Sequence, residues 1–399
     1  MKLAEVATYV SDKICSSNIS LKQYVTTDSL LQDKRGRECA QNLPPVVTNL
    51  THYQQGDVLV ANIRPYLKKI WFADCDGGAS LDVLVFRAKN PADASFVYAI
   101  LMQDAFYDYA MKGAKGSKMP RGDKDQIMRY EIPTFSPCQR KNIGKFIVDI
   151  ESKIAINRQI NDNLEAMAKQ LYDYWFVQFD FPNEEGKPYK SSGGKMVWNE
   201  KLKREIPEGW NDGCFSDIAN ITMGQSPDGS SYNEDSKGVI FYQGSTDFGI
   251  RFPSVRMYTT APTRFAKQGD ILMSVRAPVG AVNIANTDCC IGRGLSAINS
   301  KIGSMTYIYF VIHYLKVRFD NLNSAGTTFG SITKDDLHEL PIVIPSSDVI
   351  KMFESISKPI FDKQMNIGQE IENLTKLRDE LLPLLMNGQV SVNYHLSHD

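Results

Sequence analysis

Residues 55–59 have the sequence Gln-Gly-Asp-Val-Leu, and residues 268–272 have the nearly identical sequence Gln-Gly-Asp-Ile-Leu. The similarity extends outward, because residues 3–7 (Leu-Ala-Glu-Val-Ala) have a counterpart in residues 215–219 (Phe-Ser-Asp-Ile-Ala). An internal repeat of roughly 210 residues in a chain of 399 residues predicts two similar halves, each large enough for its own core.

The sequence similarity between the two halves continues beyond these stretches. Residues 63–65 (Ile-Arg-Pro) align with residues 275–277 (Val-Arg-Ala), which matches Arg64 with Arg276. The Gly-Ser pair at 116–117 aligns with the pair at 330–331, and a Glu-apolar-Pro sequence follows each pair, at 131–133 and 339–341. Because alternating apolar residues indicate strands and turns in both halves, we expect the α+β class, with one mixed α/β domain in each half.

A long helix is expected after each half. Apolar residues alternate by four and three from Ile143 to Trp175 and from Phe353 to Leu384, which is the heptad pattern of a coiled coil. The predicted second seam includes Ile356, Lys363, Glu370, Leu377 and Leu384. The first helix ends where the second half begins, and the second helix begins where that half ends, so the pair is predicted to be antiparallel. The polar seam residues Asn157, Asn161, Lys363 and Glu370 either fix the register or mark a locally solvated seam, and both interpretations remain open.

These patterns predict a pseudo-two-fold arrangement in which an antiparallel two-helix coiled coil separates two similar domains. The predicted domains are residues 1–137 and 205–347, and the predicted helices are residues 138–182 and 348–389. Residues 183–204 form a turn-rich, partly basic linker, and residues 390–399 form a tail.

Composition excludes several classes of protein. A net charge of -1 argues against a chain that coats nucleic acid indiscriminately, so any nucleic-acid surface must be local. The seven scattered cysteines suit reduced thiols, and no apolar run approaches the ~20 residues of a membrane helix, so a cytoplasmic protein is expected.

Motifs of catalysis and metal binding are missing from the sequence. The histidines lack metal-ligand spacing, and phosphate-binding loops and nucleophile elbows are missing. We therefore expect no catalytic residue, metal ion or cofactor in this chain.

Polar loops at matching places in the two halves are the candidate binding residues, because rigid scaffolds usually carry such residues on loops. Lysine and arginine suit phosphate contacts, hydroxyls bond phosphates or bases, and arginine and glutamine recognise guanine and adenine by paired hydrogen bonds. A merely solvated basic loop in the first half, and helix capping by Ser331 or Thr333 in the second, are the competing interpretations. The candidates in the first half are Arg64, Lys68, Lys69, Lys112, Lys115, Ser117, Lys118 and Arg121. Those in the second half are Gln225, Ser226, Tyr232, Gln243, Arg276, Arg293, Thr327, Thr328, Ser331 and Lys334.

Residues 171–181 (Leu-Tyr-Asp-Tyr-Trp-Phe-Val-Gln-Phe-Asp-Phe), followed by Ile-Pro-Glu-Gly-Trp at 206–210, resemble the specificity subunits of type I restriction-modification systems. The resemblance covers essentially the whole chain. It departs from the family pattern at the start, where the first half opens at Leu3 without an Ile-Pro-x-Gly-Trp sequence. The tail at 390–392 (Val-Ser-Val) is a candidate to complete that domain instead.

This resemblance implies a non-catalytic subunit whose two target-recognition domains recognise a bipartite, asymmetric sequence in double-stranded DNA. It also implies docking of two modification subunits, which carry S-adenosylmethionine, and of restriction subunits. A non-catalytic coiled-coil adaptor of a related defence or anti-restriction system is the alternative, and a self-contained methyltransferase or nuclease is disfavoured by the missing motifs.

Overall fold

The computed structural model describes residues 1–249, 251–324 and 331–392, with the side chains of 317–324 left aside. The chain divides into two compact units. Unit 1 consists of Met1–Ile156 and Glu372–Asp399, and unit 2 is the continuous stretch Asn157–Ile371.

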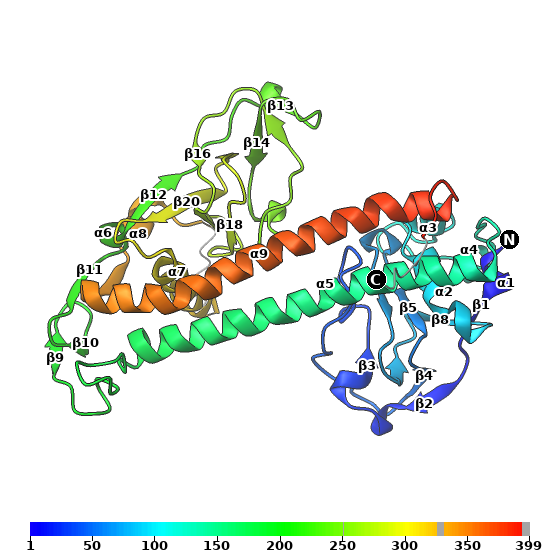
Figure 1. The fold of residues 1–399 in the computed structure, drawn as a ribbon, viewed down its shortest axis with the longest axis horizontal. Coiled ribbons are helices and arrows are strands. Elements are labelled where there is room, and N and C mark those ends of the chain that lie inside the picture. Colours follow the sequence, from blue (N-terminus) through cyan, green and yellow to red (C-terminus); the bar gives the residue numbers. More distant parts are fainter. Residues whose placement is uncertain (250, 325–330, 393–399) are drawn as a thin grey trace, which may run out of the picture. The chain divides into compact units, whose positions relative to one another are not determined.

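Unit 1 contains two four-stranded sheets, and Figure 1 labels β1, β2, β3, β4, β5 and β8 among their strands. The first sheet is antiparallel, with the order β1 (Ala7–Tyr9), β8 (Val83–Ala88), β5 (Val58–Ala61) and β6 (Ile70–Phe72). The second has the order β2 (Lys13–Cys15), β4 (Asn49–Tyr53), β7 (Gly77–Ala79) and β3 (Tyr24–Val25), with β3 and β7 parallel. The helices are α1 (Leu3–Val6), α2 (Ala94–Leu101), α3 (Asp104–Lys112) and α4 (Lys124–Ile127), with short 3-10 turns η1 (Ser16–Asn18), η2 (Leu21–Gln23), η3 (Pro65–Leu67) and η4 (Pro91–Asp93).

Unit 2 repeats the first of these sheets with the same strand order. Its four strands are β12 (Ala219–Met223), β20 (Leu295–Ser300), β17 (Ile271–Ser274) and β18 (Val282–Ile284). A five-stranded sheet has the order β13 (Tyr232–Asn233), β15 (Tyr258–Thr259), β14 (Val239–Tyr242), β19 (Cys289–Ile291) and β16 (Phe265–Ala266), with β14 and β19 parallel as β3 and β7 are in unit 1. The other elements are the pairs β9 (Met196–Asn199) with β10 (Arg204–Pro207) and β11 (Asn211–Cys214) with β21 (Pro341–Ile344), and α6 (Phe215–Ile218), α7 (Met305–Ser324), α8 (Lys334–His338), η6 (Gly229–Ser231) and η7 (Ser245–Asp247).

The repeated Gly-Asp sequence forms the same tight turn in both units. Gly56 has φ +89° and Gly269 has φ +88°, a backbone conformation that residues with a side chain rarely adopt. The Asp57 carboxylate accepts the backbone N–H of Gln54 at 2.8 Å, and the Asp270 carboxylate accepts that of Lys267 at the same distance. The internal repeat predicted from the sequence is therefore confirmed in the backbone.

Two details of the predicted alignment are wrong. Asn62 N–H donates to Asp82 O, and Val275 N–H donates to Gly294 O, so residue 275 corresponds to residue 62. Arg276 therefore corresponds to residue 63, not to Arg64. The loop that follows is also shorter in the second half, because the backbone pairs Ser331 with residue 276 as it pairs residue 121 with residue 63. Ser331 thus corresponds to residue 121 and not to Ser117.

Two long helices, α5 (Pro137–Tyr172) and α9 (Ser347–Met386), contribute residues to both units, and a π-helical turn, η5 (Asp173–Val177), extends α5. In unit 1, Arg378 lies 2.6 Å from Glu151. In unit 2, the Asn157 amide donates to Glu370 at 2.9 Å. In unit 2, Asn157 meets Glu370 and Gln364 donates to Asn161 O, so rising residue numbers on α5 meet falling numbers on α9 and the pair is antiparallel. Unit 1 has the same order, because the Asn142 amide donates to Val392 O and Glu151 meets Arg378.

The seam of α5 is confirmed, including buried Asn157 and Asn161. The predicted seam of α9 is wrong at Ile356, Lys363, Leu377 and Leu384, which are exposed. Ser357, Gln364 and Arg378 are buried in their place, since each finds hydrogen-bond partners there. A heptad count misses this stripe because its members are polar.

One loop of unit 2 contacts both α5 and α9. The Arg251 guanidinium lies 3.3 Å from Glu165 on α5 and 3.3 Å from Gln364 on α9, and it donates to the Tyr309 hydroxyl at 3.2 Å. Its side chain is 9% exposed. The loop between β14 and β15 is thereby fixed to both helices.

The stretch that carries the family resemblance forms an aromatic cluster in unit 2. Phe181 stacks on Trp210 with ring centroids 4.9 Å apart, and Phe176 lies 6.0 Å from the same indole. Trp175 and Phe353 lie in the same core. These aromatic residues join the end of α5, the start of the second repeat and the start of α9 into one packed region.

Candidate nucleic-acid interface

Four of the predicted binding residues of unit 2 come together around the turn that connects β19 to β20. The turn closes when Leu295 N–H donates to Gly292 O at 3.0 Å, which leaves Arg293 exposed at its tip. Arg293 N–H donates to the Ser226 hydroxyl at 3.2 Å, and the neighbouring Gln225 is anchored through its backbone to β19. The turn thus carries a guanidinium beside a hydroxyl and an exposed amide.

Gln243 reaches the same turn from the end of β14. A Cβ atom on Gly294 would lie 2.6 Å from Gln243 O, and one on Gly292 would lie 3.1 Å from Gln243 Cα. Position 294 therefore requires glycine, and position 292 leaves little room for a side chain. The Gln243 backbone is held by the Asp247 carboxylate at 2.8 Å.

Arg276 and Ser331 also come together, because their backbones form an antiparallel bridge and both residues are exposed. Lys334, at the start of α8, is exposed as well. Thr333 caps α8, since its hydroxyl accepts the Asp336 N–H at 3.2 Å. The competing interpretation of helix capping thus applies to Thr333, while Thr327 and Thr328 lie outside the described residues.

Tyr232 is half-buried and supports the five-stranded sheet. Its hydroxyl donates to Pro227 O at 3.1 Å, and its ring lies 4.9 Å from that of Phe241. Both its polar group and its ring therefore have partners within the unit.

In unit 1 the basic loop after α3 folds over the turn that follows β5. The backbones of Lys115 and Arg121 exchange two hydrogen bonds of 2.9 Å, and Arg64 N–H donates to Pro120 O at 2.8 Å. Arg121 pairs with Asp82 at 3.1 Å. Ser117 and Lys118 of this loop are exposed, and so is Lys112 at the end of α3.

Residues 207–382 match the family described as the type I restriction modification DNA specificity domain. The chain is 34% identical, over 78% of its length and 72% of the relative's, to a protein of Methanocaldococcus jannaschii named putative type I restriction enzyme MjaX specificity subunit. The chain belongs to the type I restriction enzyme specificity subunits.

Other similar proteins are more distant. The HindI specificity subunit of Haemophilus influenzae is 23% identical over 84% of this chain and 87% of that protein. A type I restriction-modification S subunit from M. genitalium, known from its crystal structure, has 13% identity and a TM-score of 0.59 over 97% of this chain and 95% of that one. The latter likeness concerns the fold alone.

As a specificity subunit, the chain is a non-catalytic subunit of a DNA methyltransferase and endonuclease complex. Among the described residues, no cluster of His, Cys, Asp and Glu has the arrangement of a metal site. In the same part of the chain, no helix has the length and apolar character needed to span a bilayer.

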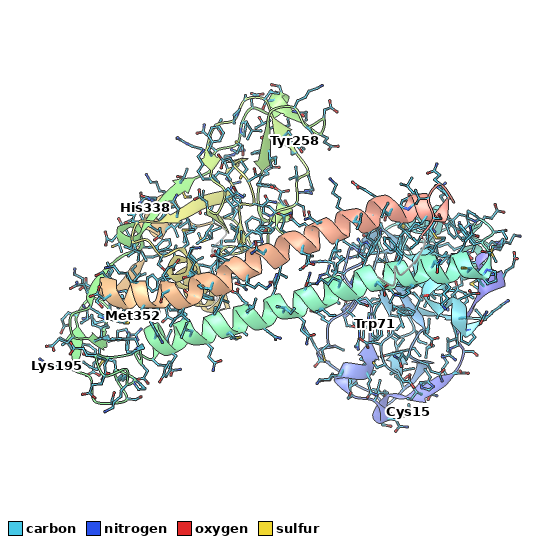
Figure 2. The ribbon with its side chains drawn as sticks, viewed as in Figure 1. Cys15, Trp71, Lys195, Tyr258, His338 and Met352 are labelled. Carbon is cyan, nitrogen blue, oxygen red and sulfur yellow. The ribbon has the colours of Figure 1, made fainter. Side chains whose placement is uncertain are left out.

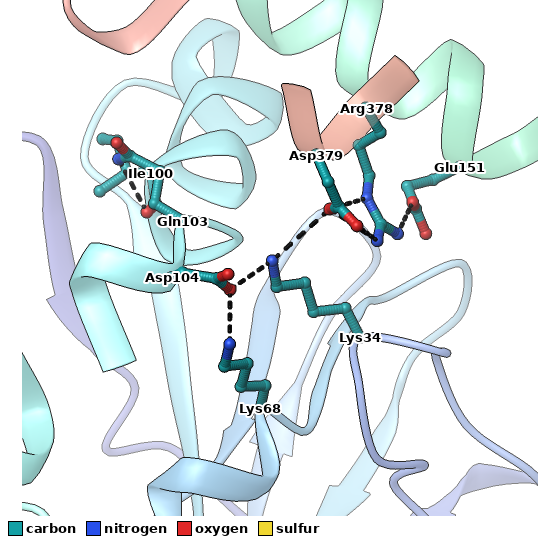
Figure 3. A network of polar contacts seen from close by, with 8 residues as sticks. All are labelled: Lys34, Lys68, Ile100, Gln103, Asp104, Glu151, Arg378 and Asp379. Atoms are coloured by element: carbon teal, nitrogen blue, oxygen red, sulfur yellow. Dashed lines mark hydrogen bonds and ion pairs between the residues drawn. The ribbon is translucent and has the colours of Figure 1, made fainter. Parts of the chain in front are cut away.

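Lys68 and Lys69 have partners inside this specificity subunit. Lys68 lies 3.0 Å from Asp104, which also pairs with Lys34 at 2.7 Å (Figure 3). Burial raises the pKa of Asp104, but the hydrogen bonds from both lysines outweigh it and leave this pKa below the usual value. The Lys69 ammonium bonds to Thr27 O, and burial lowers its pKa. Any phosphate contact at these two lysines would compete with the internal partners.

Three residues near these candidates were not predicted from the sequence: Leu81, Asp82 and Arg256. Arg256 is exposed and pairs with Asp247, the residue that holds the Gln243 backbone. The Gly-Arg-Gly sequence at 292–294 is a local signal for a tight turn with an arginine tip.

Two aromatic residues labelled in Figure 2, Trp71 and Tyr258, belong to sheet strands and not to these loops. The Arg37 guanidinium stacks over the Trp71 ring, 4.1 Å from its centroid.

Proposed function

We propose that the two units recognise the two halves of a bipartite, asymmetric DNA target, unit 1 one half-site and unit 2 the other. Support comes from the strand order that the units share and from the different side chains on their matching loops. Identical loops would favour identical half-sites, whereas the bridge residue is Arg121 in unit 1 and Ser331 at the equivalent place in unit 2.

In unit 2, Arg293, Gln243 and Gln225 are the proposed base-contacting residues. Their exposed guanidinium and amide groups match the paired acceptors of guanine and the donor and acceptor of adenine in the major groove. Ser226 orients the Arg293 turn through the hydrogen bond at 3.2 Å. Further proposed contacts are Arg276, Ser331, Lys334, Tyr232, Thr327 and Thr328.

In unit 1, we propose that five exposed residues contact phosphates: Lys112, Lys115, Ser117, Lys118 and Arg121. Such contacts fix the position of a protein on DNA without selecting a sequence. Arg64, Lys68 and Lys69 complete the proposed set, the last two by exchanging their internal partners for phosphate.

We also propose that α5 and α9 form an antiparallel coiled-coil spacer that separates the domains and docks two modification subunits, to which restriction subunits add. S-adenosylmethionine is expected in the modification subunits, and the assembly is expected to act in the cytoplasm. The antiparallel contacts within each unit support the helix pairing.

The test is co-expression of this chain with the modification subunit encoded beside it, followed by single-molecule sequencing of host DNA to map methylated bases. A new gapped motif that appears only with this chain is the expected result. If the complex forms and no motif appears, the adaptor alternative is favoured instead.

Two variants sharpen this test. Arg293→Ala should relax the preference at one position of one half-site, at a cost of about 1–3 kcal/mol in binding. Lys118→Ala should weaken binding to all sequences equally and lower the slope of log K against log salt by about 1. If Arg293→Ala weakened binding to all sequences equally, as Lys118→Ala is expected to do, the base-reading role of Arg293 would be contradicted.

A further inference from the structure

The turn between β7 and β8 in unit 1 has the same hydrogen bonds as the turn between β19 and β20 in unit 2. Val83 N–H donates to Ser80 O at 3.0 Å, and Leu295 N–H donates to Gly292 O at 3.0 Å. Each turn follows a strand that pairs in parallel with a strand from earlier in the same unit: β7 pairs with β3, and β19 pairs with β14. The two turns are therefore equivalent positions of the repeat.

The residue after each tip is also held in the same way. Asn62 N–H donates to Asp82 O at 2.8 Å in unit 1, and Val275 N–H donates to Gly294 O at 2.9 Å in unit 2. Each turn is thus fixed on both sides, and its tip residue projects from a rigid backbone.

Leu81 and Arg293 are the tip residues. Leu81 is 72% exposed, although leucine is among the residues most often buried in folded proteins. Arginine at such a tip is complementary to guanine, which offers two acceptors in the major groove. An aliphatic side chain in the same place has the 5-methyl group of thymine as its complement.

The surroundings of Leu81 combine basic and apolar groups. Arg121 pairs with the adjacent Asp82 at 3.1 Å, and the loop that carries Arg121 also carries Met119, which is 51% exposed. Tyr66, which is 50% exposed, lies on the turn that pairs with this loop. A cation for phosphate and apolar side chains for base methyl groups thus occur on adjoining loops.

We propose that Leu81 is a specificity-determining residue that contacts the 5-methyl group of a thymine in the half-site of unit 1, at the place where unit 2 uses Arg293. The proposal rests on the proposed function, since it requires that unit 1 bind a half-site. It extends that function by assigning different base chemistry to the same turn of the repeat.

The test uses the full chain in complex with its modification subunits and duplexes that carry the mapped motif. Each thymine is replaced in turn by uracil, which removes the methyl group and keeps the base pair. We expect one replacement to weaken binding of the wild-type complex about four-fold, the effect of one buried methyl-sized group. The same replacement should have no effect on the Leu81→Ala complex.

Arg293→Ala is the matched control, because it alters the equivalent tip of the other unit. It should retain the full response to uracil and lose discrimination at a guanine of the other half-site. Both side chains are exposed, so thermal unfolding should confirm that both variants fold normally.

Two results would overturn the assignment of Leu81: a unit 1 half-site without thymine, or an unchanged uracil response in Leu81→Ala. A wild-type complex with no preferred motif would instead contradict the proposed function, and the inference would fall with it. The two failures are therefore distinguishable.

Discussion

Arg87 donates to both carboxylate oxygens of Asp57, at 2.8 Å and 2.7 Å, and Asn299 occupies the equivalent place opposite Asp270. Asn299 donates to Asp270 at 3.3 Å. Both aspartates cap the same Gly-Asp turn, but one has a guanidinium partner and the other has an amide. Burial raises the pKa of the Asp270 carboxyl above its usual value.

The Asn299→Arg variant should rebuild the missing ion pair in unit 2. A raised folded-state pKa means that Asp270 contributes stability below its unfolded pKa of about 3.9 and loses it as the pH rises through the folded value. A guanidinium favours the ionised form, so the free energy of unfolding should rise by about 1 kcal/mol at pH 7 and by less at pH 4. Urea unfolding measures both values, and an equal gain in Asn299→Gln would refute the electrostatic explanation.

The Asp104→Asn variant should lower stability in the opposite pH range. The hydrogen bonds from Lys34 and Lys68 hold the pKa of Asp104 below its usual value, so its contribution is present above about pH 4 and lost as the pH falls through the folded pKa. Because the Asp104 side chain is 59% exposed, solvent screening limits the cost to about 0.5 kcal/mol at pH 7. Thermal unfolding from pH 7 to pH 3 should show the two proteins converging, and Asp108→Asn on the same helix is the control.

The Arg378→Met variant should destabilise unit 1 strongly. Arg378 is 3% exposed and lies 2.6 Å from Glu151, which is 15% exposed and would be left without this partner. Removing one member of a buried pair costs about 3–5 kcal/mol, whereas replacing both with neutral groups costs much less. Guanidinium unfolding of Arg378→Met and of the double variant with Glu151→Gln measures the difference, and equal losses would show that packing, not charge, dominates.

Insertion of seven residues into both α5 and α9 tests the proposed spacer. Seven helical residues add about 10 Å, which corresponds to about three base pairs of B-DNA. Methylation mapping should therefore show a gap longer by about three base pairs between unchanged half-sites. A methylated motif with its original gap would rule out the helices as the element that sets the spacing.

The parts of the molecule that repeat, or that follow an apolar period, could be predicted from the sequence. The repeat was found because Gln-Gly-Asp occurs in both halves, and the structure gives the reason: each turn has a glycine with positive φ and an aspartate that caps it. The seam of α5 was found because most of its members are apolar. On α9, buried Gln364 and Arg378 escaped prediction, because their burial depends on partners from α5 that no local period shows.

The residues of the candidate interface could be predicted only in part. Arg293 and Gln243 were singled out by residue type, and the structure brings them to one turn. Lys68 was predicted to bind DNA because the sequence cannot show that Asp104 lies beside it. Leu81 was overlooked because a leucine next to a strand suggests a core residue unless its turn is known to project outward.

Unit 1 is built from both ends of the chain, because α9 supplies Leu382, Leu385 and Met386 to its core and Arg378 to its buried ion pair. Unit 2 is one continuous stretch, and the ribosome completes it before those residues of α9 are made. The unit that is synthesised first is therefore the last to acquire its full core. Until the end of α9 emerges, the core that includes Ile143 and Ile147 is incomplete, so we expect this nascent half to be the one more exposed to aggregation during translation.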